Sequence, residues 1–274
     1  MFHDLFFSKS KSKVPKPCPI ALSTRVRLAR NLSEFPFPGR AESGQKKAVL
    51  SKCMSALGKV KPLLSSTSVE LDELSELDRQ ILVEKHLISL ELSQSEESGG
   101  VVLSNDRACS VMVNEEDHLR IQVLANGLDF SKVWKLADSL DSGIESSLDY
   151  AFDSQLGFLT ACPTNLGTGM RASVMMHLPG LVMSKNMDKV INAVNHLGIA
   201  VRGLFGEGSD ASGSIFQISN QQTLGESESA ILERLEMTLE NIVQQERLAR
   251  EKLSEDDGLR LTDKISRAVG FQIR

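Results

Sequence analysis

This 274-residue chain contains two kinds of hydrophobic pattern: amphipathic segments with helical spacing, and short apolar segments typical of strands. Apolar residues recur at three- and four-residue spacing over residues 41–57 and 73–84, which predicts two amphipathic helices. The hydrophobic pattern then changes. Short apolar segments bounded by turn-forming polar residues follow, at Gly100–Leu103, Ala108–Val113 and Leu119–Leu124. Because no crossover helix fits between runs this close together, they predict an antiparallel meander of strands.

The second half of the chain continues this mixture of elements. Helices are predicted over Phe130–Leu148, Met187–Leu197 and Glu226–Leu253. Further strands are predicted at Gly157–Thr160, Ala172–Met176, Val201–Leu204 and Ser214–Asn220. The whole order of elements predicts an α+β fold, with one large antiparallel β-sheet flanked by helices.

The chain is expected to have three parts. Residues 1–19 alternate serine with lysine and then contain prolines, which predicts a flexible N-terminal arm. Residues 20–253 carry the periodic pattern and are predicted to form the main domain. Residues 254–274 are expected to be the start of a C-terminal helical domain that is truncated or absent.

Composition narrows the class of protein. With 41% apolar and 24% charged residues, the chain can bury a sizeable core. There is no apolar run long enough for a membrane span and no signal peptide at the N-terminus, so we expect a cytoplasmic protein without membrane contact. The net charge of −5 argues against a general nucleic-acid binder. The cysteines at positions 18, 53, 109 and 162 lack Cys-x-x-Cys spacing, so neither a disulfide framework nor a zinc site is predicted.

Arginines gather beside predicted strand ends and turns, at Arg25, Arg27, Arg120, Arg171 and Arg202. In the extended segment Ser-Thr-Arg-Val-Arg, alternation places the first two guanidinium groups on one face. Each arginine alone is better interpreted as a surface residue paired with one of the 36 acidic residues. As a group they favour a phosphate cradle, because the guanidinium fork matches phosphate oxygens.

Two acidic segments and one loop complete the candidate chemistry. The run Asn114 to His118 contains three carboxylates, and pattern alone gives a solvated turn about even odds. Glu207 stands between two glycines, which would expose its carboxylate in a tight turn. The loop from Cys162 to Val174 combines a thiol, two glycines and an arginine, which suits close approach to a phosphate chain.

Four segments together resemble the ATP:guanido phosphotransferases. They read Ser-Thr-Arg-Val-Arg from Ser23, Asn-Glu-Glu-Asp-His-x-Arg from Asn114, the loop from Cys162 to Val174, and Arg-Gly-x-x-Gly-Glu from Arg202. They occur in the family's order and cover roughly residues 20–253, and four such segments in register are strong support for the resemblance. The segment Leu197 to Glu226 is most similar to the bacterial protein-arginine kinase branch.

The resemblance implies a fold, an activity and a set of site residues. The fold would be the glutamine-synthetase-like catalytic domain of guanido kinases, over residues 20–253. The cofactors would be ATP and Mg²⁺, with the metal held mainly through the phosphates. Catalysis would involve Glu207, Glu116 and Cys162. ATP would contact Ser23, Thr24, Arg25, Val26, Arg27, His86, Arg120, Arg171, Ala172, Ser173, Val174, Met175, Arg202, Gly203, Leu204, Phe205 and Gly206.

The implied reaction transfers the γ-phosphoryl group of ATP to a guanidinium nitrogen of arginine. An arginine guanidinium stays protonated up to a pKa above about 12, so a carboxylate must orient the nitrogen and help to remove its proton. Glu207 is the first choice for this base, with Glu116 beside it. Cys162 would orient the guanidinium as a thiolate, and would also be sensitive to oxidation. For His86, a structural role is the commoner one for a lone histidine.

The implied acceptor is an arginine in a protein. Kinases of free guanidino compounds carry a helical domain ahead of Ser-Thr-Arg-Val-Arg, whereas here the motif starts at Ser23. The branch also carries a C-terminal Arg-Asp-x-x-Arg-Ala motif that this chain lacks, which puts activation by phosphoarginine in doubt. Expected partners are protein substrates with exposed arginine, a zinc-binding activator protein, a stress-response repressor, a Clp-type unfoldase and a second copy in a homodimer. A kinase of free arginine or another small guanidino compound, and a non-catalytic ATP- or arginine-binding adapter, remain the alternatives.

Overall fold

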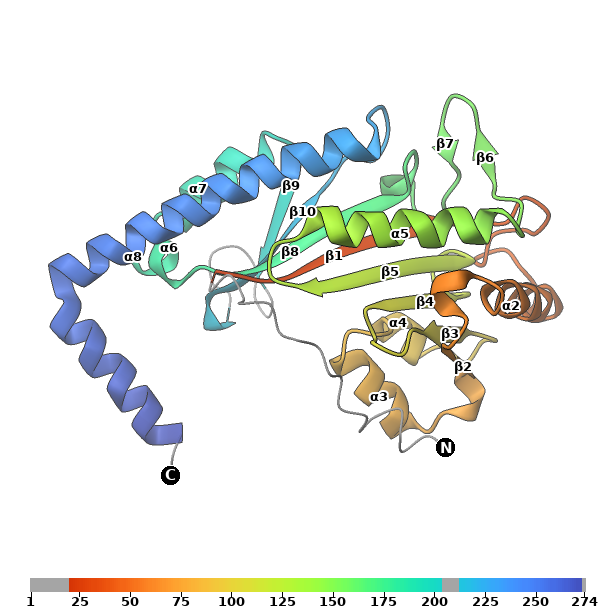
Figure 1. Ribbon diagram of the computed structural model, residues 1–274, viewed down its shortest axis with the longest axis horizontal. Coiled ribbons are helices and arrows are strands. Elements are labelled where there is room, and N and C mark those ends of the chain that lie inside the picture. Colours follow the sequence, from red (N-terminus) through yellow and green to blue (C-terminus); the bar gives the residue numbers. More distant parts are fainter. Residues whose placement is uncertain (1–19, 204–211, 273–274) are drawn as a thin grey trace.

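The computed structural model describes residues 20–203 and 212–272. Within these residues, eight strands form one sheet in the order β2-β3-β4-β5-β1-β8-β10-β9, and all neighbours are antiparallel (Figure 1). The strands are β1 (Ala21–Arg30), β2 (Thr67–Glu70), β3 (Gly100–Leu103), β4 (Cys109–Val113), β5 (Leu119–Asn126), β8 (Met170–His177), β9 (Ile199–Gly203) and β10 (Ile215–Asn220). A separate hairpin joins β6 (Phe152–Asp153) to β7 (Gly157–Phe158).

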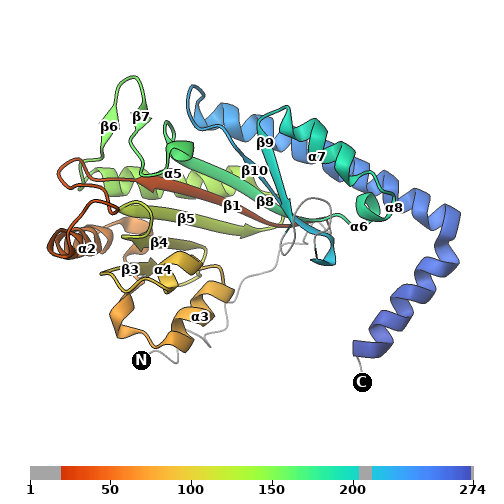
Figure 2. The ribbon, with the colours of Figure 1, turned by 180° about the vertical axis from the view of Figure 1, so that it is seen from behind.

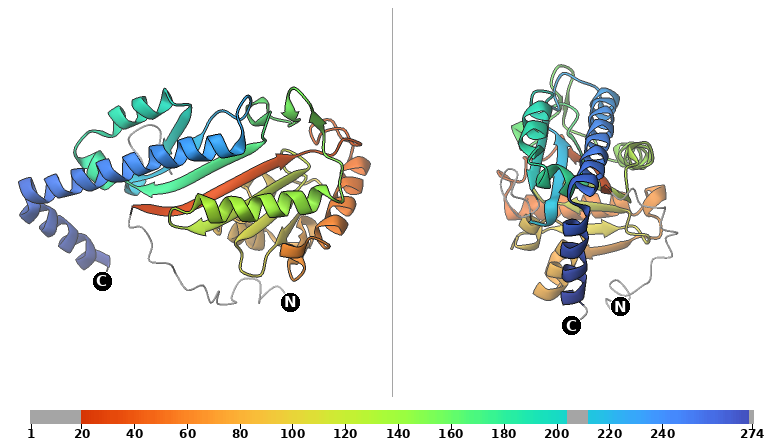
Figure 3. Two further views of the ribbon diagram at one scale, coloured as in Figure 1. Left: turned by 45° about the horizontal axis from the view of Figure 1, so that its top comes forward. Right: turned by 90° about the vertical axis from the view of Figure 1, so that its left-hand side faces the viewer.

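The helices surround this sheet. They are α2 (Ser43–Leu57), α3 (Glu76–Glu84), α4 (Leu90–Ser93), α5 (Phe130–Glu145), α6 (Pro179–Met183), α7 (Met187–Asn195) and α8 (Glu228–Gln272). In Figure 3, α5 lies along the central strands, and α8 runs over the neighbouring part of the sheet before extending away from the body. No helix within the described ranges is long and apolar enough to cross a membrane.

The main hydrophobic core lies between one face of the sheet and helices α2, α5 and α8. Alternate residues of the central strands, such as Val26 on β1 and Val174 on β8, are fully buried in it. From the helices, Cys53 of α2, Leu140 of α5 and Leu235 of α8 pack into the same cluster. This face of the sheet therefore stabilises the fold by burying apolar side chains.

The opposite face is covered at one end. A second, smaller core packs Leu82 of α3 and Leu92 of α4 against Val101 and Met112 of strands β3 and β4. Seen from behind in Figure 2, α5 lies beyond the sheet while α3 and α4 lie below its central strands, β1 and β8. Helices α3 and α4 thus cover the β3 and β4 end of this face, whereas α5 lies on the other face.

Most of the predicted elements are confirmed. Strands β3, β4 and β5 are consecutive antiparallel neighbours, as the predicted meander requires. The helices predicted over 41–57, 130–148 and 187–197 correspond to α2, α5 and α7. The helix predicted from residue 73 begins only at Glu76, because the Ser75 hydroxyl caps it by accepting the Asp78 N–H at 3.2 Å.

Helices α4 and α6 and strand β6 were not predicted, and three other elements differ from the prediction. The segment 157–160 contributes only Gly157–Phe158, which pairs with β6 and not with the large sheet. Edge strand β2 was missed, because only Val69 of its residues is buried and the run shows no apolar alternation. Helix α8 continues to Gln272, past the predicted end at Leu253. The predicted arm 1–19 and the predicted strand end at Leu204 lie outside the described residues.

Candidate active site

A cleft of about 680 Å³ opens on the face of the sheet that α5 does not cover. Its walls come from the segment 83–97 around α3 and α4, from the acidic turn 114–116, and from the loop that contains Cys162. Its floor carries all five arginines expected to converge, and the other predicted site residues that line it are His86, Glu116 and Cys162. The structure thus brings together most of the chemistry that the sequence suggested.

Strand register explains why the arginines share one face. On β1, Val26 and Leu28 point into the helical core, so the alternating Arg25 and Arg27 point the other way. Arg27 lies directly opposite Arg171 of β8, and Ala29 lies opposite Arg120 of β5. Residues directly opposite each other in an antiparallel pair share a face, so guanidinium groups from different strands gather in one place. The predicted alternation around Arg25 is therefore confirmed.

Within the residues that the structure describes, three arginines of the cluster have few negative partners. Among the described residues, Arg25 and Arg27 make no side-chain hydrogen bond or ion pair, and the buried Nε of Arg171 has no partner. Burial, together with Arg25, Arg120 and Arg171, lowers the pKa of Arg27 to about 9. Burial and the same kind of repulsion also lower the pKa of Arg25 and of Arg171. Such a cluster favours a polyanion, because a bound anion relieves the repulsion between the cations.

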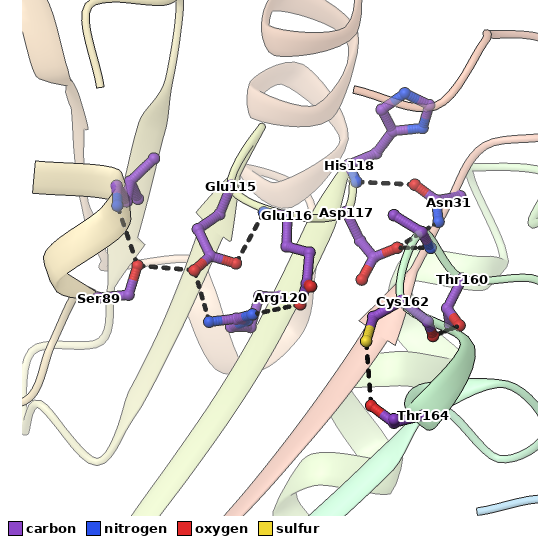
Figure 4. Close-up of polar contacts among 12 residues, drawn as sticks. Asn31, Ser89, Glu115, Glu116, Asp117, His118, Arg120, Thr160, Cys162 and Thr164 are labelled. Carbon is purple, nitrogen blue, oxygen red and sulfur yellow. Dashed lines mark hydrogen bonds and ion pairs between the residues drawn. The ribbon is translucent and has the colours of Figure 1, made fainter. Parts of the chain in front are cut away.

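Arg120 is the paired member of the cluster. Its guanidinium donates to Glu115 Oε1 at 2.5 Å and to Glu116 Oε2 at 3.1 Å (Figure 4). Glu115 also accepts from the Ser89 hydroxyl at 2.7 Å, and its side chain is only 3% exposed. Glu116, at 42% exposed, is the carboxylate of the pair that is open to the cleft. The two neighbouring glutamates therefore have different surroundings.

The acidic turn, residues 114–118, is held by hydrogen bonds and is mostly buried. Asn114 has a φ of 56°, and its side-chain amide donates to the carbonyls of Lys46 and Ser98, both at 2.8 Å. Asp117 and His118 are buried. His118 accepts the Leu32 N–H on Nδ1 at 3.0 Å, so its Nε2 donates to the Pro36 carbonyl, and burial lowers its pKa. The interpretation as a solvated turn is thus wrong for all of the run except Glu116.

The loop around Cys162 is held on several sides. A short 3₁₀ turn, Pro163–Asn165, follows the cysteine, whose Sγ lies 3.0 Å from the Thr164 hydroxyl. Gly167 has a φ of 108°, and a Cβ there would lie 2.2 Å from the Thr223 carbonyl oxygen. The fully buried Arg30 donates to the Thr168 carbonyl at 2.9 Å and pairs with Asp141 at 2.6 Å. The thiol therefore stands on a fixed part of the cleft wall.

His86 sits at the opposite wall. Its backbone has a φ of 57°, and its carbonyl accepts from the Gln122 side chain at 2.7 Å. Burial and the nearby Arg25 lower the pKa of the imidazole, which favours its neutral form. A neutral ring beside a cation cluster can contact a ligand without adding to the repulsion.

Some of the predicted site residues do not line the cleft with their side chains. Thr24, Val26, Ala172 and Val174 are fully buried on the helix-covered face, and the Thr24 hydroxyl donates to the Gly127 carbonyl at 2.6 Å. Ser23, Ser173 and Met175 share the arginine face by register but lie outside the lining, as does Gly203 at the end of β9. Glu207, Leu204, Phe205 and Gly206 lie outside the described residues.

Sequence reasoning gave no separate role to several residues that support the site. Glu115 and Ser89 fix Arg120, and Arg30 fixes the loop of Cys162. The order of Glu115 and Glu116 in a turn does not say which of them is buried. Arg30 follows Val26 and Leu28 in the β1 alternation and so lies on the helix-covered face, but an apolar pattern does not predict a buried arginine there.

The chain matches a family model described as the ATP:guanido phosphotransferase C-terminal catalytic domain over residues 48–249. It is 46% identical to a protein-arginine kinase of Caldanaerobacter subterraneus subsp. tengcongensis over 254 residues, which are 92% of this chain and 75% of that protein. It is 47% identical to a protein-arginine kinase of Symbiobacterium thermophilum, over 92% of this chain and 72% of that protein.

Solved structures show the same fold. The duplicated taurocyamine kinase of Schistosoma mansoni, with bound transition-state analog components, aligns with a TM-score of 0.76 at 27% identity over 88% of this chain. This chain spans 35% of that kinase. A lombricine kinase aligns with a TM-score of 0.73 at 22% identity, over 93% of this chain and 78% of that protein. The predicted antiparallel sheet with flanking helices is therefore the fold of guanidino kinases.

Proposed function

The chain belongs to the ATP:guanido phosphotransferase family, and on that premise we propose that it phosphorylates arginine residues in proteins. The γ-phosphoryl group of ATP passes to a guanidinium nitrogen, giving phosphoarginine and ADP. The single observation that carries the proposal is the cleft floor of five arginines beside an accessible Glu116 and Cys162. The protein-arginine kinases to which the chain is 46–47% identical support the choice of acceptor.

The arginine cluster fits the triphosphate of ATP. Phosphoryl transfer depends mostly on positioning and on stabilising charge on the phosphate oxygens. Arg25, Arg27, Arg120, Arg171 and Arg202 would contact those oxygens. The mutual repulsion of the arginines, which lowers the pKa of Arg25, Arg27 and Arg171, supports this role. Mg²⁺ would be held by the phosphates. No group of three His, Cys, Asp or Glu among the described residues is arranged to hold a metal ion.

The acceptor guanidinium needs carboxylates. Glu116 is exposed in the cleft and shares Arg120 with Glu115, so a substrate guanidinium can replace Arg120 as its partner without leaving Arg120 unpaired. We assign Glu116 to orient the acceptor nitrogen by accepting its N–H. Glu207 remains our first choice for the base that takes the proton as the N–P bond forms and the bond to ADP breaks.

Cys162 has a supporting part in this scheme. Its sulfur lies on the cleft wall beside Thr164 and within the field of Arg171. As a thiolate it would attract the substrate guanidinium electrostatically, without forming a covalent intermediate. The accessible cysteine of the described set is also the one that oxidation would reach first.

The cellular setting follows from the family and is proposed with it. We place the enzyme in the cytoplasm, where ATP and unfolded proteins are available, in stress response and protein quality control. Protein substrates with exposed arginine are the necessary partners. A zinc-binding activator, a stress-response repressor, a Clp-type unfoldase and a homodimer partner are further proposals from the resemblance alone.

Transfer assays test the proposed function. The protein is incubated with radiolabelled MgATP and either a basic protein or free arginine, and acid-labile phosphate on arginine is measured. We expect label on the protein, and its loss in Glu207→Ala with ATP binding largely retained. Label on free arginine alone would support the small-guanidino kinase, and label on neither would support the adapter. Full activity in Glu207→Ala would refute the assignment of the base.

A further inference from the structure

A buried carboxylate connects the two walls of the cleft that carry the reacting groups. Asp117 is 1% exposed, and its Oδ1 accepts the backbone N–H of Ala161 and the side-chain amide of Asn31, both at 2.6 Å. Asp117 follows Glu116 directly in the chain, and Ala161 directly precedes Cys162. Figure 4 shows the Asp117 carboxylate beside Glu116 and above Cys162.

Asn31 reinforces this connection from the end of β1. Its side-chain oxygen accepts the His118 N–H at 2.9 Å, and its amide also donates to the Leu159 carbonyl at 3.1 Å. Its own carbonyl accepts the Ala151 N–H at 2.7 Å. Asn31, 1% exposed, thus binds the acidic turn on one side and the segment leading to Cys162 on the other.

The contact is more than a general stabilising hydrogen bond. The Cys162 segment and the acidic turn are separated by more than 40 residues, and the Oδ1 bond to Ala161 joins residues 44 apart in sequence. The other oxygen, Oδ2, is buried and has no partner among the described residues. Burying a carboxylate oxygen without a partner costs free energy. This cost indicates that Asp117 serves to position the Cys162 segment and not to stabilise the fold.

We propose that Asp117 is a positioning residue for phosphoryl transfer, which sets the place of Cys162 relative to Glu116 through its bond to the Ala161 N–H. The inference rests on the proposed function, because it assigns the two connected groups to one acceptor guanidinium. Asp117 touches neither substrate in this scheme and acts through the loop. Its effect is therefore on the acceptor half of the reaction and not on the arginine cluster, whose side chains stand on the strands.

The test compares Asp117→Ala with Asp117→Asn. Alanine removes the acceptor of the Ala161 N–H, whereas asparagine keeps an oxygen for it. Misplacing a reacting group by about 1 Å can cost about 10²-fold in rate, so we expect Asp117→Ala to lower kcat by roughly that factor with KM for ATP unchanged. Asp117→Asn should recover most of kcat. Equal losses in both variants, or a loss confined to ATP affinity, would overturn the proposal.

A double-variant comparison separates positioning from simple destabilisation. If Asp117 acts through Cys162, Asp117→Ala should lower kcat much less in a Cys162→Ser background than in the unaltered protein. Costs that multiply independently would overturn the proposal. Asp153→Ala is the matched control, because this exposed carboxylate also accepts backbone N–H bonds, from Gln155 at 2.8 Å and Leu156 at 2.9 Å, but lies outside the cleft.

Hydrogen exchange gives a result that does not depend on activity. The Ala161 amide should exchange faster in Asp117→Ala than in Asp117→Asn, while strands β1 and β8 keep their protection. An unchanged exchange rate would show that the bond does not hold the loop, whatever the enzyme transfers. If exchange changes as expected but the unaltered protein transfers no phosphate, the proposed function fails and the structural tie stands.

Discussion

Arg27 shows at one position how function and stability compete in this protein. Its folded-state pKa of about 9 lies below the ordinary value of 12.5, so folding disfavours the charged form. The cost is fully present below pH 9 and is relieved as the pH rises through that value. At neutral pH the ligand-free protein therefore carries a destabilising cation that a bound polyphosphate would stabilise.

The first prediction follows from the destabilising charge of Arg27. Arg27→Met should raise Tm of the ligand-free protein by a few degrees, since about 1 kcal/mol corresponds to roughly 2–4 °C in a domain of this size. The same variant should lose most of the Tm increase that MgATP produces, because a phosphate contact is gone. Differential scanning fluorimetry measures both effects. Arg40→Met, at an exposed position, is the control and should change neither. A lower Tm in ligand-free Arg27→Met would contradict this account.

The adjacent glutamates make a second matched pair. Glu116→Gln should lower kcat by about 10²-fold with little change in the Kd for ATP, because we assign this exposed carboxylate to the acceptor and carboxylates in such roles contribute factors of this order. Glu115→Gln should instead raise the Kd for ATP, because it loosens Arg120 and Ser89. Calorimetry of ATP binding beside initial rates distinguishes them. The reverse pattern would show that the two roles are exchanged.

Single residues also mark what the sequence could and could not predict about the site. Alternation was enough to place Arg25 and Arg27 on one face, because β1 is regular there. The inward turn of Asp117 and His118 was not predictable, because it depends on the left-handed backbone of Asn114 and on partners 86 and 87 residues away. Long-range hydrogen bonds of this kind leave no period in the sequence.

Among the elements, α8 is joined to α6 and β8 by one buried carboxylate, in addition to its apolar core contacts. Glu246 is fully buried and accepts the N–H groups of Gly180 and Leu181, both at 2.9 Å, at the start of α6. It also pairs with Arg250 at 2.6 Å, and Arg250 donates to the carbonyl of His177 at the end of β8. This contact joins α8, α6 and the strand that carries Arg171.

Removing this carboxylate is the third prediction. Glu246→Ala should lower the free energy of unfolding by about 2–4 kcal/mol, because two buried N–H groups and a guanidinium lose their acceptor. Urea denaturation measures the change. Glu251→Ala, at an exposed glutamate five residues further along α8, should stay within about 0.5 kcal/mol of the unaltered protein. Similar values for both variants would show that Glu246 does not fasten the helix.

The loop beside Cys162 supports a fourth prediction through two glycines. Gly167 and Gly225 both have positive φ, of 108° and 85°, but a Cβ would collide with Thr223 only at Gly167. Gly167→Ala should therefore lower both Tm and kcat, whereas Gly225→Ala should show only the modest cost of backbone strain. Thermal unfolding and initial rates test the contrast. Equal effects would show that the loop can move aside.

Helices and strands were predicted correctly where most of their apolar residues are buried in a core. Helix α5 and strands β3 to β5 pack apolar residues against a core, so their periods are visible in the sequence. Strand β2 at the sheet edge and the hairpin of β6 and β7 have few buried residues, so their pairing is decided by neighbours and not by pattern.

For the molecule as a whole, the two faces of the sheet have different roles: one packs against the helices, and the other carries the charged cleft. Helices α2, α5 and α8 cover one face with apolar contacts that hold the arginine-bearing strands in register. The other face collects like charges that no core could accommodate, beside carboxylates and a thiol on a separate wall. This division explains how one sheet can have an apolar core on one face, where α5 lies in Figure 2, and a cluster of arginines on the other.

The central claim is that the acceptor is an arginine within a protein. The most direct test is a competition in one tube, with MgATP, an unfolded arginine-rich protein and free arginine at equal guanidinium concentration, followed by tandem mass spectrometry at neutral pH. The account predicts N-phosphorylated arginine residues in the protein, little phosphorylated free arginine, and a large loss of the protein product with Glu116→Gln. Phosphate found mainly on free arginine, or only on hydroxyl side chains, would contradict it.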